Sequence, residues 1–521
     1  MTAGRRLLAG RDWTAWLLLA AVALLALLLL GKVVDSITTM LAFFNWPFQF
    51  DESEGMIVAE TLLLDHGVNI YGPLTPAQFI AAPYPPLFYL LNWPVIHLAG
   101  PTFKAGRALS LLATAGAGGL IYLITLRLTR DALAGLLGAL SWGAISLVTF
   151  WGALVKPDML ALACSLGGLW WILRTPAGGL GRLWAALPFL WAAFYSKQTA
   201  IAATVAVCVW LILREWRTGL LFTALFVAGA AGGYLALNGL TDGGYFYHEF
   251  TVHDLPWFPG RYLGRLADWA TAYGLVILPG VLGVGLLLGH DAVALLRAAA
   301  GPGGALRRLG RWGTLAAPQG GLLVAGYLGM SLVTASGAGT LGGNHNHLLD
   351  LTAACCLGLA LAVAAIRQVP GRAWRVSGAL AVLVLCTQVP RLYDTPHWLG
   401  HELRVRTEIT DGMRNIAQYT SNTPGLVYAT DLSVLLATDK WQARLWTTDP
   451  YTQTHATLYH RWDEAALLQA IREQRFALVI LPPVNLDSAE ALGVLSPGLT
   501  AALRQAYQLD QRNVEYIYKP R

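Results

Sequence analysis

The sequence contains few charged residues and few cysteines. Only 13% of its 521 residues are charged, against roughly 25% in an ordinary soluble domain, and the mean hydropathy is +0.51. So few charges cannot cover a soluble globule of this size, which excludes a purely cytosolic enzyme. The apolar content of 55% excludes a disordered chain. The five cysteines lie in apolar stretches without metal-binding spacing, so we interpret them as buried hydrophobic residues.

Long apolar runs separated by short arginine-bearing segments make up most of the chain. The first run, 13–34, is long enough to cross a hydrocarbon core of roughly 30 Å. Ten further runs follow at 105–126, 132–150, 159–173, 183–195, 199–213, 220–240, 266–288, 315–335, 348–366 and 374–389. We therefore predict an all-α polytopic membrane protein with about 11 transmembrane helices. The net charge of +6 follows from arginines between these runs, so we expect no nucleic-acid partner.

One shorter apolar run, 86–99, decides the predicted sidedness. It contains Pro94 and His97 and is too short for an ordinary crossing. If it lies along the outer interface, the arginine-rich connections share the side of the amino terminus, and the acidic connections collect on the other side. The positive-inside rule then predicts a cytoplasmic amino terminus, a first outer loop over 35–104 and a multi-pass protein of the inner cell membrane.

The composition changes after residue 390, where charges, prolines and turn residues return. Segments 425–429 and 476–481 are typical of short strands, and 463–474 is typical of an amphipathic helix. We therefore divide the chain into a transmembrane catalytic domain, 1–390, and a small soluble α/β domain, 391–521. Eleven crossings place this second domain outside the cell membrane.

Unusual polar residues gather on the predicted outer side. Asp51, Glu52 and Glu54 open the first outer loop, and clustered carboxylates suit a proton acceptor or a cation site, although a solvated acidic loop would look the same. Lys156 and Asp158 occupy a tight turn between two apolar runs. Ionisable residues at membrane depth usually face a cavity, but an ion pair between these two would explain them equally well.

Two further outer turns carry ligand-type side chains. Lys197 lies in Ser-Lys-Gln, where a cation could bind a phosphate at headgroup level or simply extend to the interface. His345 and His347 lie in Gly-Gly-Asn-His-Asn-His, a spacing that is no known zinc signature. We favour the polar lining of a sugar or phosphate pocket over a metal site. Whether a divalent cation, Mg²⁺ or Mn²⁺, takes part stays open, and no other cofactor is implied.

The order of these motifs resembles the GT-C glycosyltransferases. The acidic pair Asp51-Glu52 is followed by YPPLFYLL from Tyr84, AGRALS around Arg107, KPDML from Lys156 and SKQTA around Lys197. The sequence is most similar to glycosyltransferase family 39, the protein O-mannosyltransferase and lipid A aminoarabinose transferase branch, over roughly the first 240 residues. Each motif alone is weak, but their order and common side are fairly specific.

The resemblance implies transfer of a hexosyl or pentosyl group, with inversion, from a polyprenyl-phosphate donor to a lipid, glycan or protein acceptor on the outer face. It assigns the role of base to Asp51, with Glu52 and Asp158 as further catalytic acids. It implies that Lys197 is a phosphate ligand and Arg107 a second, weaker one. Our further substrate-binding candidates are Lys156, Tyr84, His345 and His347, although Lys156 departs from the family pattern and the role of the two histidines does not follow from it. A transporter or flippase of lipid-linked sugars is the alternative, but transporters usually carry midplane polar groups and internal repeats, which this sequence lacks.

Overall fold

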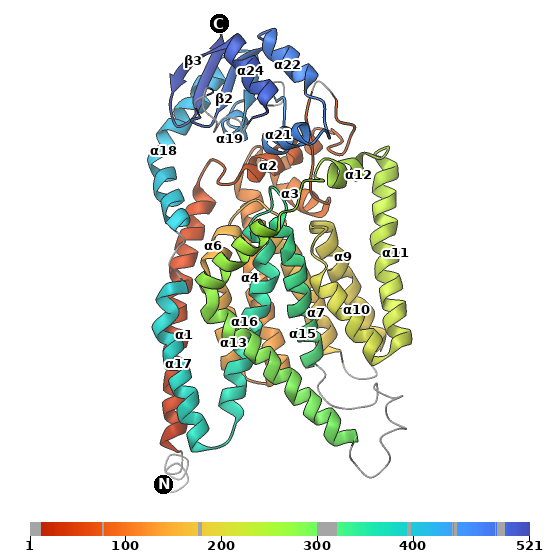
Figure 1. The fold of residues 1–521 in the computed structure, drawn as a ribbon, viewed down its shortest axis with the longest axis vertical. Helices are drawn as coiled ribbons and strands as arrows, with labels where there is room; N and C mark the ends of the chain where they lie inside the picture. Colours follow the sequence, from red (N-terminus) through yellow and green to blue (C-terminus); the bar gives the residue numbers. More distant parts are fainter. Residues whose placement is uncertain are drawn as a thin grey trace.

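The computed structural model describes residues 12–75, 78–175, 180–299, 320–392, 397–439, 441, 445–484, 486 and 495–521. Helices run side by side through most of the molecule, and a small sheet domain lies across one end of the bundle (Figure 1). The carboxyl terminus lies in this domain, whereas the amino terminus lies at the opposite end (Figure 1). The two ends of the bundle therefore differ in what they carry.

Seven helices in the described part of the chain are long and apolar enough to cross a membrane. They are α1 (Trp13–Asn45), α4 (Lys104–Thr129), α11 (Trp216–Leu240), α13 (Pro259–Ala299), α15 (Gly320–Thr334), α16 (Leu349–Gln368) and α17 (Arg372–Leu392). Each coincides with one of the eleven predicted runs. The protein is therefore a multi-pass integral membrane protein.

The other four predicted runs form shorter helices. They contain α5 (Ala132–Ala144) and α6 (Ser146–Trp151), α7 (Asp158–Arg174), α8 (Leu180–Leu183) with η1 (Trp184–Ala186) and α9 (Leu187–Ser196), and α10 (Ala202–Arg214). A 13-residue helix such as α5 is only about 20 Å long, less than a hydrocarbon core. Run 132–150 is interrupted because Ile145 has an extended backbone (φ −83°, ψ 125°). In the described part of the chain, seven of the eleven predicted crossings are long helices, and the other four are shorter helical segments.

The centre of the bundle is formed by α16, whose residues from Leu349 to Ala364 are almost all buried. It packs on α13 through glycines. A Cβ atom at Gly283 would lie 1.9 Å from the Gly358 carbonyl oxygen, and one at Gly358 would lie 2.1 Å from that of Gly280. The two backbones therefore touch directly, an approach that small residues permit between membrane helices.

Short elements cover the end of the bundle beneath the sheet domain (Figure 1). They include α2 (Glu52–Asp65), α3 (Leu87–Ala99), α12 (Gly244–Phe246), the π-helical turn η2 (Tyr247–Thr251) and the 3₁₀ turns η4 (Ala335–Gly339) and η5 (His345–Leu348). Helix α3 is the short run that decided the predicted sidedness. It is joined to α2 where Trp93 Nε1 and His97 Nδ1 both lie 2.7 Å from Asp65 Oδ1. The position of α3 at one end of the bundle agrees with the prediction that run 86–99 lies along the interface rather than crossing the membrane.

The carboxyl-terminal region contains a four-stranded mixed sheet in the order β1-β2-β4-β3. Its elements are α18 (His397–Asn422), β1 (Leu426–Ala429), α19 (Leu432–Leu436), α21 (Pro450–Leu458), α22 (Ala465–Arg472), β2 (Phe476–Leu481), α24 (Pro497–Ala506), β3 (Tyr507–Arg512) and β4 (Tyr516–Pro520). Strands β1 and β2 are parallel, and the other pairs are antiparallel. The two predicted strands and the predicted helix correspond to β1, β2 and α22, whereas β3 and β4 were not predicted.

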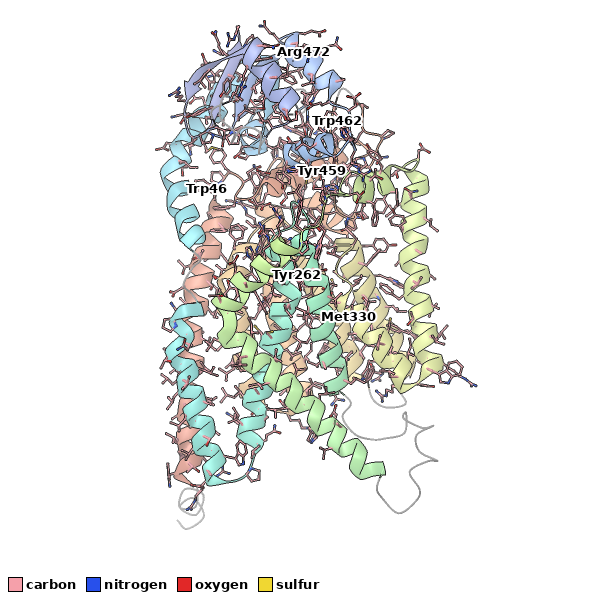
Figure 2. All side chains as sticks on the ribbon, viewed as in Figure 1. Trp46, Tyr262, Met330, Tyr459, Trp462 and Arg472 are labelled. Carbon is pink, nitrogen blue, oxygen red and sulfur yellow. The ribbon has the colours of Figure 1, made fainter. Side chains whose placement is uncertain are left out.

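The sheet domain is anchored to the bundle by apolar and backbone contacts. One hydrophobic cluster extends from β1, β2 and α19 to the buried face of α2. Phe79 pairs with Thr447 in a short bridge, and its ring packs edge-on against Trp462 at 5.1 Å. Tyr459 and Trp462 lie at this junction, whereas Arg472 lies on the far side of the domain (Figure 2). The domain is thereby positioned directly over the start of α2.

Candidate active site

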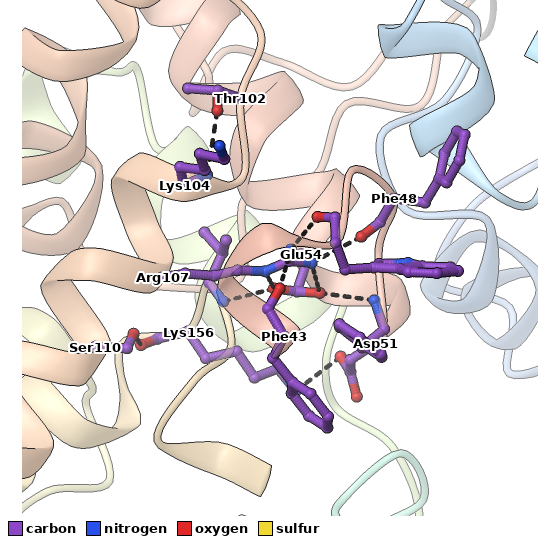
Figure 3. Close-up of polar contacts among 12 residues, drawn as sticks. Phe43, Phe48, Asp51, Glu54, Thr102, Lys104, Arg107, Ser110 and Lys156 are labelled. Atoms are coloured by element: carbon purple, nitrogen blue, oxygen red, sulfur yellow. Dashed lines mark hydrogen bonds and ion pairs between the residues drawn. The ribbon is translucent and has the colours of Figure 1, made fainter. Parts of the chain in front are cut away.

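The first predicted acid forms an ion pair at the start of α2. Asp51 is the N-cap of this helix and accepts a hydrogen bond from the Ser53 backbone at 3.1 Å. Its Oδ1 atom lies 3.0 Å from Lys156 Nζ, which comes from the turn between α6 and α7 (Figure 3). The Lys156 ammonium also lies 4.6 Å from the centre of the Trp151 ring. Asp51 and Lys156, 105 positions apart, are thus neighbours in space.

This pairing fixes the charge of both groups. Burial by itself would raise the pKa of Asp51, but the Lys156 ammonium and the hydrogen bonds from Ser53 outweigh burial and lower it. Burial would likewise lower the pKa of Lys156, but Asp51 reverses the effect and raises it. Both groups are therefore charged at neutral pH.

A second buried pair holds the loop that carries Asp51. Arg107 of α4 donates from Nε and Nη2 to the two carboxylate oxygens of Glu54, each at 2.9 Å, and both side chains are fully buried (Figure 3). Its remaining N–H groups donate to the backbone oxygens of Phe43, Trp46 and Phe48. We call this arrangement the Arg107 clamp.

The clamp uses every donor that Arg107 has, because a guanidinium carries five N–H groups and each has an acceptor in the protein. Glu54 is equally occupied, since it also accepts from the backbone N–H groups of Phe50 at 2.7 Å and Val155 at 2.8 Å. Arg107 was predicted as a substrate ligand. Its contacts fit a positioning residue better, because they join α1, α2 and the turn before α7.

The second predicted acid pairs with the second predicted lysine. Asp158, the first residue of α7, accepts from Lys197 Nζ through Oδ1, and the same oxygen accepts from Asn346 Nδ2 at 2.9 Å. The Asp158 side chain is 2% exposed and that of Lys197 is 10% exposed. Lys156 and Asp158 are separated by one residue, yet each pairs with a residue from elsewhere. The alternative in which these two close a hairpin by pairing with each other is therefore wrong.

A small cavity lies beside this second pair. It has a volume of about 20 Å³, and its lining includes Asp158, Lys197, Asn346, His347 and Asp350. Asp158 Oδ2 and Asn346 Oδ1 are buried and have no hydrogen-bond partner among the described residues. A cavity of this size holds about one water molecule.

Tyr84 is within electrostatic range of both ion pairs. Its segment is held by hydrogen bonds from Tyr71 Oη to the Tyr84 carbonyl at 2.6 Å and from Gln198 Nε2 to the Pro83 carbonyl at 3.3 Å. Burial raises the pKa of Tyr84. Lys156 opposes this rise, whereas Asp158 and then Asp51 add to it. The phenol therefore stays protonated within electrostatic range of both pairs.

Glu52 lies near Asp51 and near two acids of the carboxyl-terminal domain that the sequence did not connect with it. Its side chain is exposed at the start of α2, but the surrounding protein displaces much of its bulk water. This desolvation, followed by the charges of Asp449, Asp51 and Asp431, raises the pKa of Glu52 to about 7. Asp431 and Asp449 are the N-caps of α19 and α21. The carboxyl-terminal domain thus contributes to the electrostatics of the site.

The two predicted histidines have different surroundings. His347 lines the cavity beside Asp158 and Lys197. His345 faces α13, where its Nδ1 atom lies 3.0 Å from Arg265 Nη1, which also donates to Asn344 Oδ1 at 2.6 Å. In the described part of the chain, no group of three or more His, Cys, Asp or Glu side chains is arranged to hold a metal ion.

Residues 83–237 match the family model of dolichyl-phosphate-mannose-protein mannosyltransferases. No curated protein matches the chain. The matched segment contains Tyr84, Arg107, Lys156, Asp158 and Lys197, five of the nine predicted site residues. It therefore confirms the resemblance that their order indicated.

The fold is shared with solved membrane glycosyltransferases. ArnT from Cupriavidus metallidurans in the apo state has a TM-score of 0.54 at 13% identity, covering 94% of this chain and 97% of that one. The same protein bound to undecaprenyl phosphate has a TM-score of 0.54 at 14% identity, covering 94% and 98%. The apo oligosaccharyltransferase of Archaeoglobus fulgidus has a TM-score of 0.51 at 11% identity, covering 96% and 73%. Together with the family match over residues 83–237, this fold identifies the chain as a membrane glycosyltransferase.

Three residues near the site of this glycosyltransferase escaped the sequence analysis. Glu54 was noted only as part of an acidic cluster, Asn346 only as part of the Gly-Gly-Asn-His-Asn-His motif, and Asp449 not at all. Asn346 could have been noticed because an amide beside His347 at a turn before an apolar helix is costly to bury without a partner. Asp449 gives no such signal, because an aspartate before a proline-led helix is an ordinary N-cap.

Proposed function

We propose that this glycosyltransferase moves a sugar, with inversion, from a polyprenyl-phosphate donor to an acceptor hydroxyl, with Asp51 as the base. The donor class is supported by the matched family, whose name specifies dolichyl-phosphate mannose, and by the shared fold of a protein bound to undecaprenyl phosphate. One observation carries the proposal. Two carboxylate–lysine pairs, the partly buried Asp51–Lys156 and the buried Asp158–Lys197, lie at the same end of the bundle, and the charges of both pairs act on Tyr84.

The base has a clear chemical task in this reaction. A sugar or serine-type hydroxyl is a weak acid, so its attack on the anomeric carbon requires a group that takes its proton as the bond forms. A positioned carboxylate contributes about 10²- to 10⁴-fold to such a step. Lys156 keeps Asp51 ionised at neutral pH, which leaves it able to accept that proton. Nearby carboxylates also stabilise the positive charge of an oxocarbenium-like transition state.

The leaving group needs cations rather than an acid. A phosphate monoester leaves without protonation, and its growing negative charge is stabilised by fixed positive groups. Lys197 is our first candidate, since it lies beside the cavity near the membrane-embedded bundle. Arg265 is a second, because its partners Asn344 and His345 are uncharged and directly precede Asn346 of the cavity lining. It takes the place of Arg107, whose donors are all used.

We propose that this end of the bundle faces the outside of the inner cell membrane, with the amino terminus in the cytoplasm. Among the described connections that carry arginines, α10–α11 and α16–α17 lie at the opposite end from the sheet domain, as the positive-inside rule requires for this orientation (Figure 1). Cysteine substitutions at exposed positions of the sheet domain, such as Arg472, should react with an impermeant maleimide in intact cells. Reaction only after lysis would contradict the orientation.

The base assignment is tested with Asp51→Asn. Asparagine is as good an N-cap as aspartate, so α2 keeps its cap while the base is lost. With undecaprenyl-phosphate sugars as donors, we expect transfer to fall about 10²- to 10⁴-fold while undecaprenyl phosphate still binds. Asp65→Asn, at the other end of the same helix, serves as the matched control. Near wild-type turnover of Asp51→Asn would remove Asp51 from this role.

A further inference from the structure

We infer that Asp158 and Asn346 form a subsite for hydroxyl groups of the donor sugar, and that Asn346 is a specificity-determining residue for that sugar. The inference rests on the proposed function, since it assumes a lipid-linked sugar as donor. It starts from the small cavity lined by Asp158, Asn346 and Lys197. Neither the sequence motifs nor the reaction itself assigns Asn346 a task.

The chemistry of Asp158 fixes the orientation of the asparagine amide. An ionised carboxylate only accepts hydrogen bonds, so the Asn346 atom 2.9 Å from Asp158 Oδ1 must be the amide nitrogen. The amide oxygen is consequently directed away from that contact. Asn346 is 8% exposed, so this oxygen cannot be satisfied by bulk solvent.

Two buried acceptors therefore remain unused at one place. Asp158 Oδ2 and Asn346 Oδ1 have no hydrogen-bond donor among the described residues, and both side chains line the same cavity. Buried polar atoms without partners are rare and costly, particularly on a charged group. A ligand that offers hydrogen-bond donors would satisfy both.

The charges around the cavity select the kind of donor. A phosphate offers only acceptors at neutral pH and would be repelled by the Asp158 carboxylate. An ammonium group would meet the Lys197 ammonium, which already contacts the other oxygen of Asp158. Uncharged hydroxyl groups avoid both conflicts. Lys197 lies in the lining of the cavity, where its ammonium can contact both Asp158 and the phosphate of the donor.

The size of the cavity defines what enters it. A volume of about 20 Å³ admits a hydroxyl group in place of a water molecule but not a sugar ring. The ring must therefore lie outside, with the hydroxyls of one edge directed at Asp158 and Asn346. Such a site discriminates strongly against analogues that lack those hydroxyls, because the buried acceptors would again be left without donors.

The test compares lipids that differ only in the sugar. Binding of undecaprenyl phosphate and of its mannosyl, glucosyl, galactosyl and arabinosyl derivatives to the full-length protein is measured by calorimetry in detergent. The tightest-binding derivative is then compared with its monodeoxy analogues. In the wild type we expect at least one sugar to improve affinity roughly tenfold or more over undecaprenyl phosphate, and one deoxy analogue to lose that gain.

Asn346→Leu, and Asn346→Ser as a second variant in case leucine prevents folding, should bind the sugar lipid and that deoxy analogue equally. Both variants should bind undecaprenyl phosphate as the wild type does, which shows that they are folded. Asn92→Leu is the matched control, because Asn92 in α3 is also buried, and its amide atoms have no partner in the described part of the chain. It should retain the discrimination of the wild type.

Two results would overturn the inference alone. One is wild-type discrimination that persists in Asn346→Leu or Asn346→Ser, and the other is equal binding of undecaprenyl phosphate and all its glycosyl derivatives to the wild type. In either case the cavity holds water rather than a sugar hydroxyl. Failure of undecaprenyl phosphate and every derivative to bind would instead overturn the proposed function, and the subsite with it.

Discussion

Replacement of Lys156 by methionine should change the pH dependence of sugar transfer. Lys156 is the group that keeps the partly buried Asp51 ionised, since burial alone would raise the pKa of that carboxyl. Methionine keeps the apolar length of the side chain, but it removes the ammonium that lies 3.0 Å from Asp51 Oδ1 and 4.6 Å from the centre of the Trp151 ring. The change therefore isolates the charge of Lys156.

The size of the effect follows from the geometry of the pair. An opposite charge within about 4–6 Å lowers the pKa of a carboxyl by about 1–3 units. Removing the Lys156 ammonium should therefore raise the pKa of Asp51 by about 1–3 units. A base acts only in its deprotonated form, so activity is lost as the pH falls through its pKa. In Lys156→Met the acid limb of kcat/KM should lie about 1–3 pH units higher than in the wild type.

The assay measures kcat/KM from pH 4 to 9 with an undecaprenyl-phosphate sugar as donor. Lys104→Met, a lysine of α4 that makes no ion pair with either acid, is the control and should leave the acid limb in place. An acid limb of Lys156→Met that coincides with that of the wild type would refute Asp51 as the base. A wild-type limb near pH 7 that Glu52→Gln abolishes would assign the role to Glu52, whose pKa is about 7.

The other two pairs give separate predictions. Lys197→Met should weaken binding of undecaprenyl phosphate at least tenfold more than binding of the acceptor, and the double variant with Asp158→Asn should regain the thermal stability lost when Asp158 is left buried without its partner. Equal losses for donor and acceptor would indicate a structural lysine. Arg107→Lys should lower the free energy of unfolding by about 3–5 kcal/mol, because lysine cannot supply five donors and Glu54 loses its bidentate partner. A thermal unfolding midpoint near that of the wild type would contradict the clamp.

Apolar runs predicted the long helices well and the short ones poorly. Mean hydropathy over 132–150 stays high through the extended residue Ile145, so the division into α5 and α6 has no signal in composition. The same holds for the 3₁₀ turn at Trp184–Ala186 before α9. Strands β3 and β4 did have a signal. Residues 507–520 contain two alternating runs on either side of Asn513, which is typical of a hairpin.

The site residues were predictable one at a time but not as partners. Each charge was conspicuous because it interrupts apolar sequence, a local property. Pairing depends on which turns meet, and this is set by helix packing over long separations, such as Asp51 with Lys156 or Asp158 with Lys197 and Asn346. Adjacency in the sequence was a misleading guide, since Lys156 and Asp158 do not pair with each other.

The degree to which each buried pair is satisfied separates structural from chemical roles. Arg107 and Glu54 are fully buried, and both carboxylate oxygens and all five N–H groups have protein partners, so the pair has nothing to offer a substrate. Asp158 is buried almost as deeply but keeps one oxygen without a partner among the described residues. A buried carboxylate oxygen without a hydrogen-bond donor lowers the stability of the folded protein. Since the fold supplies donors to both oxygens of the similarly buried Glu54, it could supply them to both oxygens of Asp158 as well. Incomplete pairing at Asp158 is therefore the feature that selection for binding explains and selection for stability does not.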